Sequence, residues 1–338
     1  MKRALCWLTG FLLFTFGILA VAHAEGFTYG TWLPYWEHDT SMAELNGLKG
    51  KLDEAIAFEC LFDNADQPKM LPDSVTLFND ITAACNGTNT TVFLSIVNDI
   101  ELAPDQYDNK NSDLLRRLFA DDASMTAHLE ALTRLIDTYA LTGLELDYEN
   151  LKEDTTLWNH YTTFITRLWT VCERDGVRLR VVLPWDAPKY ASLPKGPEYS
   201  VMCYNLYGYH SGPGPKADIA FLQTTCALYQ PLGLNVRMAF ATGGFDWHGD
   251  KIDALTQQEA QTALNAACVT PVRDPASGVL TATYTLDGET HTVWVADART
   301  LSLWRDTCNA FGFNAFDLFR LGGNDLADWE NALLGVQP

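Results

Sequence analysis

Leu141-Thr142-Gly143-Leu144-Glu145-Leu146-Asp147-Tyr148-Glu149-Asn150 is the stretch of sequence that decides the fold. Side chains alternate between the two faces of a β-strand, so Glu145, Asp147 and Glu149 share one face and the apolar side chains between them share the other. In the wall of a barrel, the acidic face would be directed to the interior. An amphipathic edge strand with its acids in solvent shows the same alternation, so the stretch alone leaves both arrangements open.

Short apolar runs alternate with amphipathic helical stretches on both sides of this segment, a pattern typical of a parallel sheet covered by helices. Eight runs are predicted as strands, which is the number that closes a (β/α)8 TIM barrel. The predicted strands cover residues 27–33, 54–58, 91–96, 143–148, 179–183, 200–204, 235–241 and 315–319. The predicted helices cover residues 73–84, 113–139, 154–174, 218–229 and 301–311.

Extra material lies between the seventh and eighth predicted strands. It contains a helical stretch over 256–267 and two β-rich runs over 280–286 and 289–295, which flank the two-residue turn Asp287-Gly288. We expect a small α+β insertion at about 250–297 that walls one side of the barrel mouth. No second domain is predicted, so residues 25–338 form one α/β domain in this interpretation.

The three carboxyl groups of residues 145–149 suggest a reaction. Like charges a few ångströms apart raise one another's proton affinity, so at least one of the three should stay protonated near neutral pH. A carboxylic acid kept protonated at the carboxyl end of a barrel strand is what an acid catalyst of glycosidic cleavage requires.

The same segment resembles the DGxDxDxE signature of glycoside hydrolase family 18. In this comparison Glu149 is the acid and Asp147 the preceding aspartate, while Glu145 and Thr142 replace two further aspartates. Other segments resemble motifs of the family in the expected order. They are VMCYN at 201–205 (MxYD), HSGPGP at 210–215 (SxPGP), LFRLGGND at 318–325 (WxLGxED), and both WLPYW at 32–36 and Phe58-Glu59, which resemble the spore-germination and cell-wall branch.

The resemblance implies substrate-assisted catalysis with retained configuration. Glu149 would protonate the leaving oxygen, Asp147 would orient the 2-acetamido group of the substrate, and Tyr204 would hold the acetamido oxygen. Glu145, Asn205 and Phe319 are expected to bind substrate, Asn205 in place of an aspartate and Phe319 in place of a floor tryptophan. Further candidates beside the strand ends are Trp36, Trp185 and Trp247 for sugar stacking and Asp186 for sugar hydroxyls, with packing beneath loops and turn capping as the alternatives.

The first 24 residues have the features of a signal peptide. Lys2 and Arg3 precede an apolar run over 4–21, and Ala22-His23-Ala24 is a small-x-small cleavage pattern, so we expect a secreted protein that starts near Glu25 and does not associate with membranes. An uncleaved anchor helix is the alternative.

The composition and the motifs of the sequence argue against several classes of partner. A formal charge of −20 over 338 residues repels nucleic acid and anionic lipid. Of the eight cysteines, Cys6 lies in the leader, and the odd remainder leaves at least one without an intrachain partner. We find no CxxC, HExxH, P-loop or dinucleotide motif, so no cofactor and no metal is expected.

The expected partner is therefore an N-acetylglucosamine-containing polysaccharide, either peptidoglycan or chitin, cleaved at β-1,4 bonds by a monomer. Two other functions share these motifs. One is a non-catalytic carbohydrate-binding protein on a chitinase-like barrel, although such proteins usually lose the acid that Glu149 supplies here. The other is an endoglycosidase that releases N-glycans.

Overall fold

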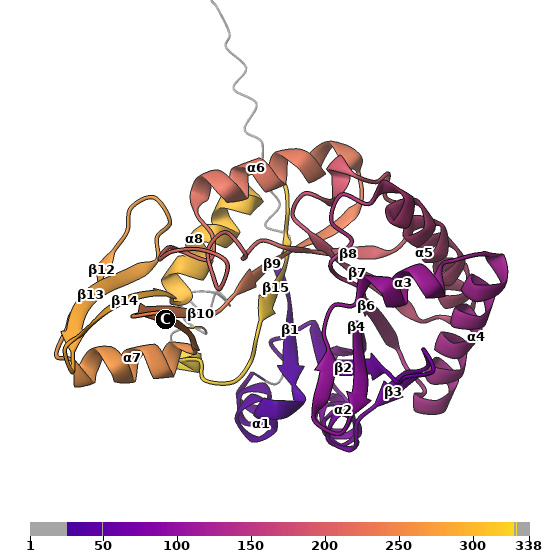
Figure 1. The fold of residues 1–338 in the computed structure, drawn as a ribbon, viewed down its shortest axis with the longest axis horizontal. Coiled ribbons are helices and arrows are strands. Elements are labelled where there is room, and N and C mark those ends of the chain that lie inside the picture. The colour runs from indigo at the N-terminus through magenta and orange to yellow at the C-terminus, as the bar shows by residue number, and fades with distance from the viewer. Residues whose placement is uncertain (1–25, 49, 328, 330–338) are drawn as a thin grey trace, which may run out of the picture.

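The computed structural model describes residues 26–48, 50–327 and 329. Within them, eight parallel strands close a barrel in the order β2-β1-β15-β9-β8-β7-β6-β4, because β2 and β4 at the two ends of this row also pair (Figure 1). The predicted (β/α)8 TIM barrel is confirmed. Its strands are β1 (Thr28–Pro34), β2 (Glu54–Phe62), β4 (Thr91–Ala103), β6 (Gly143–Asp147), β7 (Arg178–Pro184), β8 (Glu198–Met202), β9 (Asn235–Ala241) and β15 (Ala315–Phe319).

Two barrel strands run well past their predicted ends. β2 reaches Phe62 and β4 reaches Ala103, and each turns back into a short antiparallel strand, β3 (Pro68–Met70) and β5 (Gln106–Asp108). These two hairpins lie beyond the carboxyl ends of the barrel, and the second one brings the chain back to Lys110.

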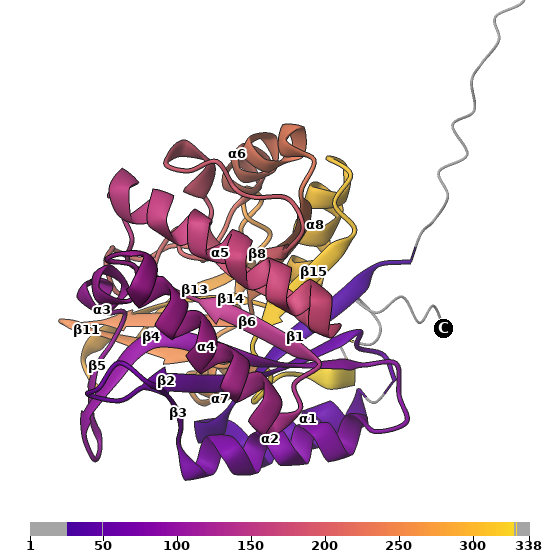
Figure 2. The same cartoon turned by 90° about the vertical axis from the view of Figure 1, so that its right-hand side faces the viewer.

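The helices largely follow the predicted ranges, with one correction. The predicted helix over 113–139 is two helices, because the Asp121 side chain accepts a hydrogen bond from the Ser124 N–H (2.8 Å) and starts a new helix. Helices α4 and α5 lie side by side outside the barrel (Figure 2). The helices are α1 (His38–Gly47), α2 (Pro72–Cys85), α3 (Ser112–Leu118), α4 (Asp122–Tyr139), α5 (Thr155–Asp175), α6 (Ile219–Tyr229), α7 (Gln257–Ala266) and α8 (Ala298–Asn309), with short 3-10 turns η1 (Tyr35–Glu37), η2 (Ala187–Lys189) and η3 (Gln230–Leu232).

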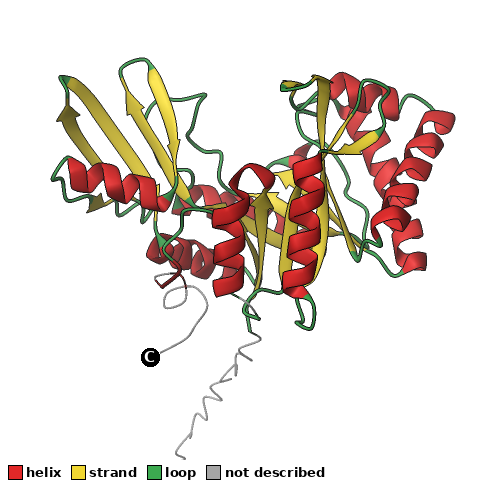
Figure 3. Ribbon diagram, turned by 90° about the horizontal axis from the view of Figure 1, so that it is seen from below, coloured by secondary structure: helices red, strands yellow, loops and turns green. Residues whose placement is uncertain are grey.

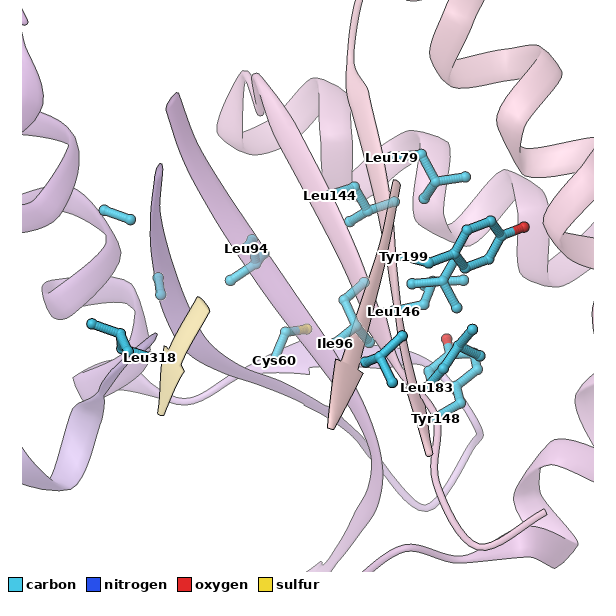
Figure 4. Packing of buried hydrophobic residues seen from close by; sticks show 14 of the residues in the cluster. Cys60, Leu94, Ile96, Leu144, Leu146, Tyr148, Leu179, Leu183, Tyr199 and Leu318 are labelled. Atoms are coloured by element: carbon cyan, nitrogen blue, oxygen red, sulfur yellow. The ribbon is translucent and has the colours of Figure 1, made fainter. Parts of the chain in front are cut away.

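The main apolar core lies between the barrel and its helices. Leu144, Leu146 and Tyr148 of the deciding segment belong to it, together with leucines of neighbouring strands (Figure 4). Their burial places the alternate residues of β6 inside the barrel. The alternation of apolar and acidic residues over 144–149 is therefore that of a barrel wall and not of an edge strand.

The amino-terminal half of the barrel interior is ionic. Arg180 and Arg237 are buried and lie with Glu54 and Asp317: Arg237 Nε is 2.8 Å from Asp317 Oδ1 and 3.3 Å from Glu54 Oε2, and Arg180 contacts Glu54. Arg178 adds contacts to Glu54 and Glu198 at the rim. Because each of these carboxylates has an arginine, the layer is neutralised internally.

The insertion after β9 is a five-stranded antiparallel sheet with α7 on one face, standing to one side of the barrel (left in Figures 1 and 3). The sheet begins at Gly243, earlier than the expected residue 250, because β10 continues the chain directly from the end of β9. Its strands are β10 (Gly243–His248), β11 (Lys251–Leu255), β12 (Val272–Arg273), β13 (Leu280–Leu286) and β14 (Glu289–Ala296).

The predicted signal peptide lies outside the described residues. No helix in the part of the chain that is described is long and apolar enough to span a bilayer. Cys60, Cys172, Cys203, Cys226 and Cys308 are buried free thiols, and Cys268 is an exposed one.

Candidate active site

A cavity of about 450 Å³ opens where the barrel strands end, and it collects most of the predicted site residues. Parallel strands bring their carboxyl ends to one mouth, so residues far apart in the sequence meet there. The residues of the prediction that line it are Trp36, Asp147, Glu149, Tyr204, Asn205 and Phe319.

Two further cavities adjoin this central one. A cavity of about 600 Å³ shares Glu149 with it and is lined by Asp186 as well. A cavity of about 360 Å³ shares Tyr204, Asn205 and Phe319 and extends toward the insertion. Glu149 and Tyr204 therefore lie at the two junctions of an extended hollow, which suits a polymer better than a small ligand.

Glu149 is positioned through its backbone and paired through its side chain. The buried Asn98 of β4 accepts a hydrogen bond from the Glu149 N–H (2.8 Å) and donates one to the Glu149 carbonyl (3.1 Å). Lys110 Nζ lies 2.6 Å from Glu149 Oε1. The carboxylate thus faces the cavity beside a positive charge.

Asp147 carries a strongly perturbed carboxyl. Burial, followed by the negative charges of Glu149 and Glu145, raises the pKa of Asp147 well above its usual value. Its Oδ1 is buried without a hydrogen-bond partner among the described residues. An unsatisfied acceptor in a cavity wall is ready to take a hydrogen bond from a ligand N–H.

Glu145 lies below Asp147 and is fully buried. It accepts hydrogen bonds from Trp32 Nε1 (2.7 Å) and from Arg180 (3.3 Å), and burial raises its pKa to about 8. The prediction that Glu145 binds substrate is therefore corrected, because its side chain has no access to the cavity. It supports the site from beneath as a predominantly neutral carboxyl.

Tyr204 and Phe319 form an aromatic wall. Their rings are stacked with centroids 5.9 Å apart, and Phe319 also contacts Trp32 and Phe58 edgewise or at a tilt. Burial raises the pKa of Tyr204 well above its usual value, with further contributions from Asp147 and Glu149. The hydroxyl of Tyr204 therefore stays protonated and can donate a hydrogen bond.

The sequence-predicted aromatic sites divide into two groups. Trp36 is half exposed and lines the central cavity. Trp185 and Trp247 line none of the three cavities: Lys189 covers the ring of Trp185 at 4.1 Å, and Trp247 is buried in β10, where its Nε1 donates to the Ser211 carbonyl (3.2 Å). The contacts of these two tryptophans are those expected for packing beneath loops.

Thr142 lies at the amino end of β6, outside the three cavities, and donates to the Val92 carbonyl (3.1 Å). Its replacement of the first signature aspartate therefore does not alter the cavity wall.

Sequence reasoning missed Asp99 and Lys110, which also line the central cavity. Asp99 Oδ1 accepts a hydrogen bond from the Lys110 N–H (2.6 Å), and this contact closes the base of the β4–β5 hairpin beside the site. The nearby Glu59 has a pKa raised by burial to about 8. The run of polar residues after the predicted third strand is the sequence feature that could have indicated Asp99 and Lys110.

The adjoining cavity toward the insertion contains two cations. Arg320 is paired with Glu37 (3.2 Å). Lys216 donates to the Thr242 carbonyl (2.9 Å) and lies 5.0 Å from the centre of the Phe245 ring, with no carboxylate of the described chain within ion-pair distance. Burial lowers the pKa of Lys216 to about 8, so it remains mostly charged at neutral pH.

Known structures share this architecture. A chitinase from Chromobacterium violaceum superposes with a TM-score of 0.77 at 18% identity, covering 93% of this chain and 100% of that one. The spore cortex-lytic enzyme SleL of Bacillus cereus gives 0.77 at 15% identity, covering 92% and 75%. A class V chitinase from Nicotiana gives 0.74 at 13%, covering 91% and 98%, and a mutant of it has been solved in complex with NAG4.

No protein-family model matches the sequence, and no curated protein matches it. The structural likeness confirms the predicted resemblance to family 18 hydrolases at the level of the fold. What the residues of this chain do must be argued from the site itself.

Proposed function

We propose that this protein is a retaining glycoside hydrolase of the family 18 type, which cleaves the β-1,4 bond after an N-acetylglucosamine residue. The observation that carries the proposal is the convergence of Asp147, Glu149 and Tyr204 on one cavity beside the ring of Phe319. The fold shared with chitinases and a cortex-lytic enzyme supports the same class of reaction.

The reaction follows from these positions. Glu149 gives a proton to the glycosidic oxygen as the bond to the leaving sugar breaks. The acetamido oxygen of the same substrate sugar attacks the anomeric carbon, and water then opens the oxazolinium with retained configuration. Asp147 accepts a hydrogen bond from the acetamido N–H, and the hydroxyl of Tyr204 donates one to the acetamido oxygen.

The contacts of the free site suggest which carboxyl group holds the catalytic proton before substrate binds. Lys110 faces Glu149 at 2.6 Å, whereas the pKa of Asp147 is raised by burial and by Glu149 and Glu145. The proton therefore rests on Asp147 in the free protein. It passes to Glu149 when Asp147 turns to the acetamido group of a bound substrate.

Lys216 favours peptidoglycan over chitin as the substrate. Its ammonium group lines the adjoining cavity without a carboxylate partner in the described chain. The lactyl group of N-acetylmuramic acid carries a carboxylate wherever it is not joined to a stem peptide, and chitin has none. A muramic residue bound next to the cleaved N-acetylglucosamine would supply the missing counter-ion.

We expect Lys216→Met to lower kcat/KM on muramic-containing glycans about tenfold more than on chitin oligomers, which corresponds to about 1.4 kcal/mol of transition-state binding. Parallel progress curves on the two substrates measure this ratio. Equal losses of kcat/KM on both substrates would show that Lys216 does not bind the carboxylate of the muramic residue.

The second candidate function is carbohydrate binding without catalysis. The ion pair between Lys110 and Glu149 favours it, because this contact occupies the carboxyl group that an acid catalyst must present to the glycosidic oxygen. The two functions make the same contacts with the glycan and differ only in turnover.

Mass spectrometry of products separates these functions. The purified protein is incubated with peptidoglycan, chitin oligomers and an N-glycopeptide, with Glu149→Gln as the matched control. New N-acetylglucosamine reducing ends from the wild type alone establish the hydrolase and identify its polymer, and release of the N-glycan identifies an endoglycosidase. Binding by both proteins without cleavage would support the carbohydrate-binding function.

A further inference from the structure

We propose that the far end of the insertion binds one divalent transition-metal ion of the Zn²⁺ type, held by His248, Glu289 and His291. These residues line none of the three cavities described above. The site is therefore separate from the glycan-binding hollow, and it is independent of the proposed hydrolase reaction.

The sheet pairing brings these side chains together. His248 of β10 and His291 of β14 are register partners on adjacent antiparallel strands, and Glu289 lies two residues before His291 on the same face. The imidazole rings are stacked with centroids 4.6 Å apart. In the sequence the two histidines belong to no metal-binding motif, and only the fold pairs them.

The distances suit a metal ion. One nitrogen of each histidine and one carboxylate oxygen of Glu289 all lie within 4.8 Å of one another, and His248 Nδ1 is 3.1 Å from Glu289 Oε2. Zinc binds such atoms at about 2.0–2.2 Å in a tetrahedron, which puts the ligand atoms roughly 3.4 Å apart. A closure of at most about 1.4 Å therefore completes the site.

Two further carboxylates orient the rings. Asp253 Oδ2 lies 2.8 Å from His248 Nε2, and Asp246 Oδ2 lies 2.7 Å from His291 Nδ1. A carboxylate on one ring nitrogen fixes the N–H there and leaves a lone pair on the other, the arrangement common to metal-binding histidines. His248 Nδ1 in turn faces a Glu289 oxygen, so either a proton or a metal ion must lie between these two acceptors.

The charge of the cluster points to the same ligand. Asp246 is only 6% exposed, and its Oδ1 is buried without a hydrogen-bond partner among the described residues. Three carboxylates thus surround two imidazoles, while Lys251, the register partner of His248 on β11, has an exposed side chain. A divalent ion would compensate this negative charge. Imidazole ligands favour zinc over the oxygen-preferring Ca²⁺ and Mg²⁺.

Zinc binding by the chelator-treated, dialysed protein tests the site. Titration calorimetry with Zn²⁺ alone should show one ion per chain, and His248→Gln and His291→Gln should each weaken binding at least about tenfold. His38→Gln is the matched control, since His38 also lies between two carboxylates, Asp39 and Asp80, but outside the cluster, and it should bind as the wild type does. Ca²⁺ should bind no better to the wild type than to His248→Gln.

Nuclear magnetic resonance of the wild-type imidazole protons keeps the test independent of whether the variants fold. Substoichiometric Zn²⁺ should shift the signals of two histidines selectively. Absence of saturable zinc binding, or equal binding by the wild type and both cluster variants, would overturn the proposal and leave a cluster held by protonated imidazole.

Discussion

Lys110 is the residue that most constrains the chemistry of this site. Its ammonium group lies 2.6 Å from Glu149, the group that would donate a proton in the proposed reaction. A positive charge at this distance favours the ionised carboxylate. The hairpin that carries Lys110 therefore places a positive charge beside both carboxyl groups, and this charge lowers the pKa of Asp147.

We expect Lys110→Met to move the alkaline limb of the pH–rate profile upward by about one pH unit, because the Lys110 ammonium lowers the pKa of Asp147, and its removal lets that carboxyl stay protonated to higher pH. The measurement is kcat/KM on one soluble glycan oligomer from pH 4 to pH 9. Lys195→Met, which removes an exposed ammonium outside the three cavities, serves as the control. An unchanged limb would mean that the ion pair does not persist in solution.

At the level of single residues, the sequence predicted the acidic and aromatic residues of the cavity but not the hairpin residues beside them. Residues 145–149 could be placed because strand alternation fixes their directions, and the structure brings Asp147, Glu149, Tyr204 and Phe319 to one cavity. Lys110 and Asp99 could not be placed, since they depend on a hairpin whose length no local pattern fixes. Glu145 was assigned to the substrate because alternation gives the face of a residue and not its depth in the barrel.

At the scale of elements, α4 makes a buried polar contact with Tyr148, the residue that follows β6. His128 Nε2 lies 2.9 Å from the Tyr148 hydroxyl, and the His128 ring is stacked on Phe164 with centroids 4.7 Å apart. Burial lowers the pKa of His128 from 6.5 to about 3. Between these values the unfolded chain binds a proton that the folded chain does not, so this contribution to stability is complete above about pH 6.5 and falls as the pH drops.

We expect the double variant His128→Phe, Tyr148→Phe to lose this part of the acid sensitivity, since it has no imidazole to protonate and leaves no phenol unpaired. The fall in unfolding free energy from pH 7 to pH 5 should be smaller than in the wild type by about 2 kcal/mol. Urea titrations at the two pH values measure the difference. Equal falls in both proteins would show that His128 is not buried in its neutral form.

The elements themselves were predicted well where the hydrophobic period was clear. β9 and β15 have the predicted bounds, and α2 and α5 differ from the prediction by one residue at each end. The break between α3 and α4 was missed, because the cap at Asp121 lies within a continuous apolar period. The insertion was recognised by its Asp287-Gly288 turn, but its predicted start was too late, because β10 begins at Gly243, with only one residue between it and the end of β9.

The barrel as a whole depends on its ionic interior. Arg180 is fully buried, with contacts to Glu54, Glu145 and Asp317, and its guanidinium lies 4.5 Å from the centre of the Phe93 ring. Removal of one member leaves buried charges without partners, which costs far more than the network itself contributes. Such a layer cannot be predicted from a single strand, because each contributing strand supplies only one or two of its members.

We expect Arg180→Met to lower the free energy of unfolding by about 3–5 kcal/mol at pH 7. Arg174→Met, which removes an exposed ion pair with Asp175, should leave the denaturation midpoint unchanged. Urea denaturation followed by tryptophan fluorescence reports both. A midpoint for Arg180→Met that matches the wild type would show that the layer rearranges without cost.

The stereochemistry of the first product tests the central claim most directly. Proton NMR during cleavage of an N-acetylglucosamine oligomer distinguishes the α and β anomers before they equilibrate. Substrate-assisted retention by the Asp147–Glu149 pair predicts the β anomer first from the wild type and no product from Glu149→Gln. An α anomer first, or undiminished cleavage by Glu149→Gln, would contradict it.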